Sequence, residues 1–298
     1  MPETLTKNPA HILIIKLGAF GDVIISQNWI RKIRLDHPQA RLTVLTTPPF
    51  AEIMRRNPST DHVIITRRAH RLFFWKNLRT QIALRSLKPD YIYDLQGNKR
   101  SRMYCRLIGR QATYDADLNK LTGEDGPHSG TVDLDWLGEP VDDLLAEHGA
   151  TGRIILLVPG CSARNAYKRW PHYSELARRL SDAGHTCVTA PGPDEISTCK
   201  EVPAAMLMNR IQGQDPTPLS IPQLAGLAKR AHYVIGNDTG PTHLCAFMGT
   251  PGVAIFGPFT SPAQVGIDRL WPIIETDDLN TLSVQSVYDH VCAHLPTS

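Results

Sequence analysis

Short apolar runs recur along the chain, each followed by a cluster of glycine and polar residues and then by a stretch with helical periodicity. They predict strands at residues 11–17, 41–46, 62–66, 91–95, 153–158, 185–190, 233–235 and 253–256. The first run is dense in Ile and Leu, which is typical of a strand buried on both faces. Strands that alternate with helices indicate an α/β fold with parallel sheets.

Amphipathic stretches between these runs predict helices at residues 23–35, 50–56, 71–87, 173–183, 221–230, 242–248 and 284–295. The rhythm lapses between residues 115 and 152, where Gly, Asp and Glu are frequent. We interpret that stretch as a linker with one or two helices. A chain of 298 residues is long enough for two domains. We therefore expect one domain at residues 1–150 and a second, built on the same strand-loop-helix theme, at residues 151–298.

Charge is unevenly distributed. The net charge is only +3, but residues 67–110 hold twelve Lys/Arg against two acids, Asp90 and Asp94. A solvated helix face is the ordinary explanation of a charge run, and an anionic partner is the alternative.

The six cysteines show neither CxxC spacing nor paired His ligands, which favours reduced thiols in the cytoplasm and argues against a zinc site. The N-terminal residues do not have the layout of a signal peptide, and no apolar run has the length of a membrane span. Hydrophobic residues make up 42% and charged residues 20%, as in soluble globular proteins.

The most informative stretch is HYVIGNDTGPTHLCAFMGTPGVAIFG, residues 232–257. It predicts a strand, a polar loop, a helix with Pro241 at its first position, and a second strand. Asp238, Thr239, Gly240 and His243 would then gather at the mouth of this helix, where backbone N–H groups suit a phosphate. Asp-Thr-Gly also occurs in aspartic proteases, but a helix follows here and the chain has no second copy. A turn with an Asx cap and a core histidine remains an alternative.

Two loops are expected at strand ends in the first domain. In GAFGD, the glycines permit a tight turn and Asp22 falls at the start of a helix, either as a cap or as a base facing a ligand. This is not a dinucleotide fingerprint, because the third glycine of G-x-G-x-x-G is absent. After the fourth strand come Lys99, Arg100 and Arg102. They are either a solvated helix start or, as their position favours, a contact for an acidic substrate.

In the second domain, the loop at residues 159–171 carries three cations, Arg164, Lys168 and Arg169, which suit a grip on phosphate. The strand at 185–190 also ends in a polar segment, residues 191–195.

The patches IIKLGAFGDVI, VPGCSARNAYKRWP and IGNDTGPTHLCAFMGTPGVAIFG occur in the order and at the spacing of glycosyltransferase family 9. The chain resembles this family, the ADP-heptose:lipopolysaccharide heptosyltransferases, nearly from end to end. The resemblance implies the GT-B architecture, in which two Rossmann-like domains with parallel sheets face a central cleft. It also implies an N-terminal acceptor domain, a C-terminal nucleotide-sugar domain, and inverting chemistry that needs no metal and no cofactor.

Roles follow from the same resemblance. Asp22 matches the proposed general base of the family and Lys168 its diphosphate-binding lysine. The donor-binding loop corresponds to Asp238, Thr239, Gly240 and His243, while Ser162 and Glu195 match looser contacts to phosphate and nucleoside. We expect Lys99, Arg100 and Arg102 to bind the acceptor.

The expected function is transfer of a heptose from ADP-heptose to a hydroxyl of a lipopolysaccharide core or similar glycan. The expected partners are this donor and an anionic glycolipid, with peripheral contact at the inner face of the inner membrane and no nucleic acid. Two alternatives stay open. One is a GT-B enzyme with another nucleotide-sugar, such as a UDP-linked transferase or an epimerase. The other is a non-catalytic nucleotide-sugar-binding protein, which would not need Asp22 as a base.

Overall fold

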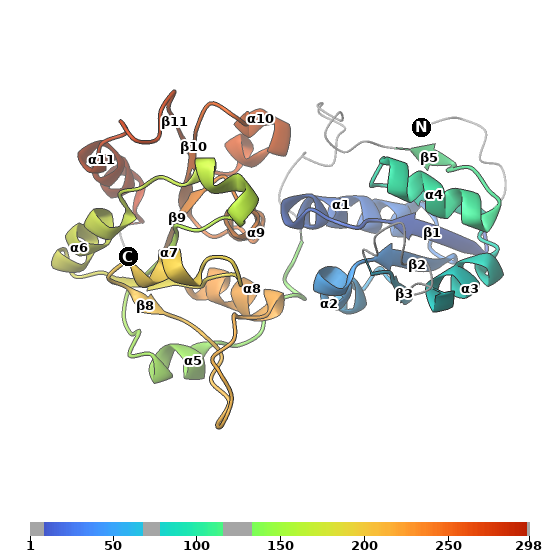
Figure 1. Ribbon diagram of the computed structural model, residues 1–298, viewed down its shortest axis with the longest axis horizontal. Coiled ribbons are helices and arrows are strands. Elements are labelled where there is room, and N and C mark those ends of the chain that lie inside the picture. Colours follow the sequence, from blue (N-terminus) through green and yellow to red (C-terminus); the bar gives the residue numbers. More distant parts are fainter. Residues whose placement is uncertain (1–8, 68–77, 116–132, 297–298) are drawn as a thin grey trace. The chain divides into compact units, whose positions relative to one another are not determined.

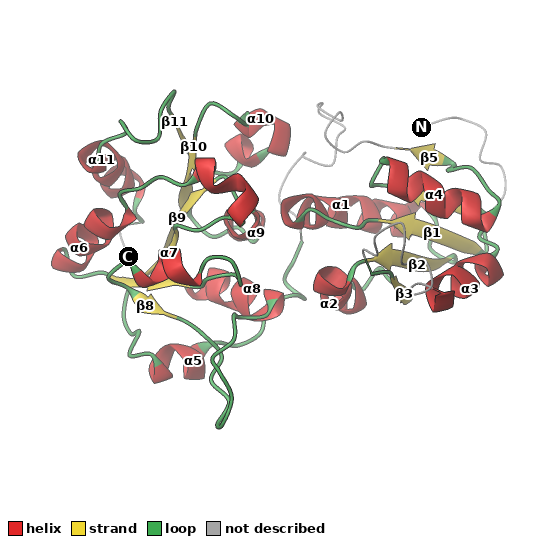
Figure 2. Cartoon of the chain, in the orientation of Figure 1, coloured by secondary structure: helices red, strands yellow, loops and turns green. Residues whose placement is uncertain are grey.

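A computed structural model describes residues 9–67, 78–115 and 133–296. The chain divides into two compact units, Met1–Val132 and Asp133–Ser298. Each unit has its own parallel sheet, and helices alternate with the strands along the chain (Figures 1 and 2). The expected α/β class with two Rossmann-like units is therefore confirmed.

The sheet of the first unit has five strands in the order β3-β2-β1-β4-β5. The strands are β1 (His11–Ile15), β2 (Arg41–Thr46), β3 (His62–Ile65), β4 (Tyr91–Asp94) and β5 (Tyr114–Asp115). The helices are α1 (Phe20–Asp36), α2 (Ala51–Arg56), α3 (Leu78–Leu87) and α4 (Lys99–Ile108). Four consecutive residues of β1, from Ile12 to Ile15, are fully buried, as the all-apolar run predicted for a central strand. Part of the predicted helix at 71–87 lies outside the described residues.

The sheet of the second unit has six strands in the order β11-β10-β9-β6-β7-β8. They are β6 (Ile154–Val158), β7 (Thr186–Thr189), β8 (Ala205–Met206), β9 (Tyr233–Asn237), β10 (Gly252–Phe256) and β11 (Ile273–Glu275). The α-helices are α5 (Asp142–Glu147), α6 (Tyr173–Asp182), α7 (Ile196–Lys200), α8 (Ile221–Arg230), α9 (Gly240–Phe247), α10 (Pro262–Val265) and α11 (Val284–His294). This is the doubly wound dinucleotide-binding order, with the topological switch between β6 and β9.

The division between the units falls before the boundary expected after residue 150. Leu134 and Leu137 are buried, and the backbone N–H of Glu139 donates to the Pro222 carbonyl of α8 over 3.0 Å. Gly226 on α8 has no room for a side chain, because an added Cβ would lie 1.7 Å from the Glu139 carbonyl oxygen. Residues 133–150 therefore pack as part of the second unit.

No helix in the described ranges combines the length and the apolar character required to cross a membrane. The six cysteines are free thiols.

Candidate functional site

The loops that follow β6 and β9 lie side by side, because these two strands are neighbours at the switch of the second sheet. Val158, the last residue of β6, pairs with Gly236 in β9. In open α/β sheets, ligands bind in the crevice at such a switch, beyond the carboxyl ends of the strands. The cationic loop after β6 and the loop with Asp238 after β9, both predicted to bind phosphate, therefore lie close together.

Asn237 ties the two loops together. Its side chain is fully buried, donates to the Pro159 carbonyl over 2.9 Å and accepts from the Trp170 backbone N–H over 3.1 Å. Both ends of the loop after β6 are thus anchored to the end of β9. Asn237 was not predicted as a site residue, although it directly precedes Asp238.

Asp238 joins Lys168 and His243. One carboxylate oxygen forms an ion pair with the Lys168 Nζ, and the other is 3.0 Å from the His243 Nε2. Burial acts to raise the pKa of the Asp238 carboxyl, but the hydrogen bonds and charges of His243 and Lys168 lower it to about 2. The Asp238 carboxylate is therefore ionised throughout the neutral range. It holds the side chains of Lys168 and His243 beside the first residues of α9.

Helix α9 presents an uncapped N-terminus beside this cluster. It begins at Gly240, so Pro241 is its second residue. The prediction had placed Pro241 at the first position. Thr239 is the N-cap residue but makes no side-chain cap; its hydroxyl lies 3.3 Å from that of Thr242 instead. Backbone N–H groups at such a helix start attract anions.

The loop after β6 uses its three cations differently. Lys168 reaches Asp238, whereas Arg169 donates from Nη2 to the Cys161 carbonyl over 2.8 Å and thereby stabilises the loop. Arg164 is exposed, as is Ser162. Of the three cations predicted to bind phosphate, only Lys168 lies at the Asp238 cluster.

Glu195, which follows β7, lies against the end of β6. It is 8% exposed, and its Oε2 accepts the Gly192 backbone N–H over 2.8 Å. A Cβ on Gly160 would come within 2.6 Å of the Glu195 side chain, so that glycine makes room for it. Burial raises the pKa of the Glu195 carboxyl, against smaller lowering effects of the Gly192 hydrogen bond and the Arg169 charge.

Asp22 lies at the switch of the first sheet, in the third position of α1. The N-cap residue is Ala19, so Asp22 is not the cap; its Oδ2 accepts the Ala19 backbone N–H over 3.2 Å. The Lys16 Nζ is 3.8 Å from the same oxygen and donates to the Leu95 carbonyl over 3.1 Å. Lys16 is 2% exposed. It was missed in the sequence analysis, although it is the one charge in the run HILIIKL.

The cations Lys99, Arg100 and Arg102 form the first turn of α4, after β4. Since β4 pairs with β1, this turn and Asp22 follow neighbouring strands at one edge of the sheet. Asn98 caps α4 through its Oδ1, which accepts the Arg100 and Ser101 backbone N–H groups. The start of a helix disfavours positive side chains, so three cations there are unexpected for stability alone.

We found no group of three or more His, Cys, Asp or Glu arranged to hold a metal ion in the ranges that the structure describes.

The model of glycosyltransferase family 9 (heptosyltransferase) matches residues 135–283 of this chain. Lipopolysaccharide heptosyltransferase 3 of Escherichia coli is 23% identical to it over 284 residues, which cover 80% of each chain.

Two solved structures share the fold. A crystal structure of a family 9 glycosyl transferase from Veillonella parvula superposes with a TM-score of 0.77 at 20% identity, covering 98% of this chain and 100% of that one. The E. coli heptosyltransferase WaaC with ADP-2-deoxy-2-fluoro heptose gives a TM-score of 0.68 at 16% identity, covering 95% of this chain and 99% of that one. The similarity in fold agrees with the GT-B class expected from the sequence.

Proposed function

Because the chain belongs to glycosyltransferase family 9, we propose that this glycosyltransferase moves a heptose from ADP-heptose to a hydroxyl of a lipopolysaccharide core or similar glycan. The observation that carries the proposal is the cluster of Lys168, Asp238 and His243 beside the uncapped start of α9. The name of the E. coli relative and the ligand of the WaaC structure favour a heptose donor.

In the proposed reaction, the second unit binds the donor. Breaking the bond between the sugar and the diphosphate builds negative charge on the leaving diphosphate, and positive groups that are already in place stabilise that charge. Lys168 and the first N–H groups of α9, near Thr239 and Gly240, would supply them. Asp238 keeps Lys168 and His243 oriented.

The loops on either side would hold the rest of the nucleotide. Ser162, exposed at the start of the loop after β6, is a candidate contact to phosphate. Glu195, near the end of β6, is a candidate to accept hydrogen bonds from the ribose hydroxyls.

In the first unit, we assign the general base to Asp22. The acceptor oxygen attacks the anomeric carbon, the bond from that carbon to the diphosphate oxygen breaks, and the hydroxyl proton passes to the Asp22 carboxylate. General bases of this kind contribute typically 10² to 10⁴ in rate. The Lys16 ammonium, 3.8 Å from Asp22 Oδ2, helps to fix the position of the carboxylate.

Lys99, Arg100 and Arg102 are the proposed contacts to an anionic acceptor. Their position in the first turn of α4 is electrostatically unfavourable for the helix and would be relieved by a bound anion. A glycolipid acceptor would bring the protein to the inner face of the inner membrane as a peripheral protein.

The experiment that tests the proposal is isothermal titration of the protein with ADP, UDP and GDP, followed by a transfer assay with ADP-heptose and a deep-rough lipopolysaccharide. We expect binding of ADP alone and release of ADP in the assay. Preferential binding of UDP would indicate a UDP-linked transferase or epimerase. Donor binding without any turnover would indicate a nucleotide-sugar-binding protein.

A further inference from the structure

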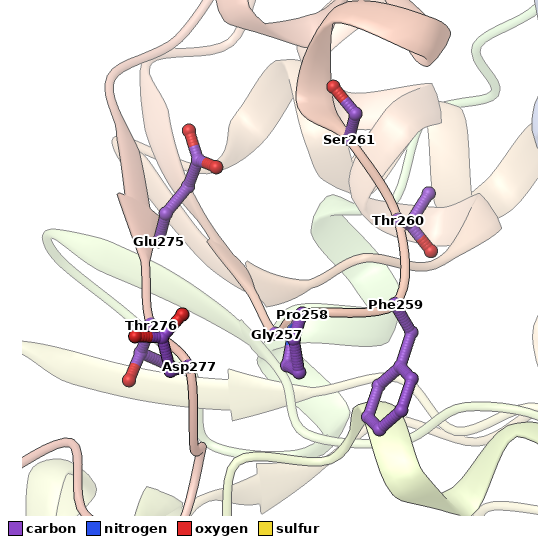
Figure 3. A pocket seen from close by; sticks show the side chains of 8 residues that line it. All are labelled: Gly257, Pro258, Phe259, Thr260, Ser261, Glu275, Thr276 and Asp277. Atoms are coloured by element: carbon purple, nitrogen blue, oxygen red, sulfur yellow. The ribbon is translucent and has the colours of Figure 1, made fainter.

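A groove lies at the carboxyl ends of β10 and β11 (Figure 3). It has a volume of about 710 Å³, with residues 257–261 along one side and residues 275–277 along the other. The lining is mostly polar, and its side chains include three hydroxyls and two carboxylates, those of Thr260, Ser261, Thr276, Glu275 and Asp277.

The two carboxylates of the groove are available to a ligand. Both residues are exposed, and across the described ranges the Glu275 and Asp277 carboxylates accept no hydrogen bond and form no ion pair. In Figure 3 the Glu275 carboxylate and the Ser261 hydroxyl point the same way from the two sides of the groove. Ionised carboxylates act only as acceptors, so this lining matches a ligand rich in hydroxyl donors.

An exposed aromatic pair connects the groove to the Lys168 cluster. Phe259, which lines the groove, is 64% exposed, and Tyr167 is 50% exposed. Their ring centroids are 4.7 Å apart at 71°. The Phe259 ring points away from Glu275 in Figure 3, and Tyr167 directly precedes Lys168 in the chain. Large exposed apolar groups beside a polar groove are typical of a binding surface.

The strand order fixes the place of this groove relative to the proposed donor site. Glu195 follows β7 and Asp238 follows β9, whereas β10 and β11 lie on the opposite side of β9 from β6 and β7. A donor with its diphosphate at the start of α9 and its nucleoside toward Glu195 would leave the β10–β11 side open to its sugar.

We propose that the groove between residues 257–261 and 275–277 binds a sugar ring of the transfer reaction. This inference rests on the proposed function. The Glu275 and Asp277 carboxylates accept hydrogen bonds from sugar hydroxyls, and the exposed Phe259 ring, which points away from Glu275, contacts C–H groups at the opposite edge of the sugar. The donor sugar and the terminal sugar of the acceptor share this chemistry, and binding measurements separate them.

The test compares Glu275→Ala, Asp277→Ala and Phe259→Ala with the parent and with Asp182→Ala, an exposed carboxylate at the end of α6. The affinities for ADP and ADP-heptose are measured by calorimetry, and the acceptor KM by ADP release. Melting temperatures confirm the fold. Should the donor sugar bind here, the groove variants lose about ten-fold in affinity for ADP-heptose while ADP binding and the control stay unchanged. Should the acceptor sugar bind here, the affinities for ADP and ADP-heptose stay unchanged, and the acceptor KM rises about ten-fold.

Two results would overturn the sugar site without touching the proposed function. One is parental affinity and parental acceptor KM in all three variants; the other is an equal loss for ADP and ADP-heptose, which would assign the groove to the nucleotide. A parent that binds neither ADP nor ADP-heptose would instead refute the proposed function, and this inference with it.

Discussion

The Lys16 ammonium lies 3.8 Å from the Asp22 carboxylate and donates to the Leu95 carbonyl over 3.1 Å. Lys16 is almost fully buried, whereas the Asp22 side chain is 30% exposed. A buried cation therefore fixes a carboxylate that stays accessible to solvent. A charged group removed from water is costly unless it is paired, so the pair is strong evidence that this end of β1 serves more than packing.

Replacing Asp22 with Asn should abolish most glycosyl transfer while leaving donor binding intact. The amide oxygen can still accept the Ala19 N–H, so the start of α1 should form as before. We expect a parental melting temperature, parental ADP affinity by calorimetry, and turnover lower by about 10² to 10⁴, because the proton leaves only as the acceptor attacks. Asp36→Asn, at the other end of α1, is the control. Full turnover in Asp22→Asn would reduce Asp22 to a structural residue of α1.

Lys16→Met should lower both stability and turnover. The Leu95 carbonyl loses its donor, which costs about 1 to 3 kcal/mol in the free energy of unfolding. Without the neighbouring ammonium, the Asp22 carboxylate loses a partner that fixes its position, so kcat should fall as well. The exposed Lys32→Met, also on α1, should change neither. A destabilised variant with parental kcat would assign Lys16 to the fold alone.

Lys168→Ala should weaken ADP binding about ten-fold to a hundred-fold, because a hydrogen bond to a charged group contributes roughly 1.5 to 3 kcal/mol. Arg164→Ala is the matched control, since Arg164 is an exposed cation of the same loop. Calorimetry with ADP measures both. Equal losses in the two variants would mean that the loop acts through its overall charge, and an unchanged affinity in Lys168→Ala would remove this residue from the site.

Much of the fold was predictable because the central strands are buried on both faces. Ile12–Ile15, Ile154–Val158 and residues 233–235 of β9 are buried throughout, and each is an uninterrupted apolar run in the sequence. Gly236 and Asn237, which complete β9, are also buried but were not predicted as part of the strand. The edge strands β8 and β11 are short and only partly buried, so their pattern is weak. Helix α4 was not among the predicted helices; only a solvated helix start was considered there, because its first turn is dominated by cations.

The candidate site was predictable where its residues are adjacent in the chain and not where they meet across it. Asp238 and His243 are only five residues apart, and their motif predicts that they lie together. Asn237 and Lys16 donate hydrogen bonds to carbonyls that are 78 and 79 residues away in the chain. A local sequence pattern cannot predict such contacts. The groove beside β11 is likewise formed by two loops separated in the chain.

The interactions of the Asp238 carboxylate with Lys168 and His243 should contribute to the free energy of unfolding, and this contribution should decrease at acidic pH. A pKa of about 2 in the folded state, below the ordinary value of 3.8, favours folding above pH 4 by about 2 kcal/mol, and this contribution is lost as the pH falls through 2. The difference in free energy of unfolding between the parent and Asp238→Asn should therefore narrow by about 1 kcal/mol from pH 5 to pH 3. Urea denaturation at both values measures it, with the exposed Asp182→Asn as control. A constant difference would mean that Asp238 is not stabilised as an ion.

Removing the cations at the start of α4 should weaken the use of an anionic acceptor without weakening the helix. Exposed charges contribute about 0.2 to 1 kcal/mol each, so the triple Ala variant of Lys99, Arg100 and Arg102 should raise the acceptor KM about ten-fold at low salt. The parent and variant should converge as salt rises, because charges are screened over about 8 Å at physiological ionic strength. Cations at a helix N-terminus oppose its dipole, so their loss should leave the melting temperature equal or higher, and unfolding cannot then explain the change. Arg106→Ala, in the last turn of α4, is the control. If neutral and anionic acceptors are used equally at low salt, these cations form a solvated surface and the acceptor contacts lie elsewhere.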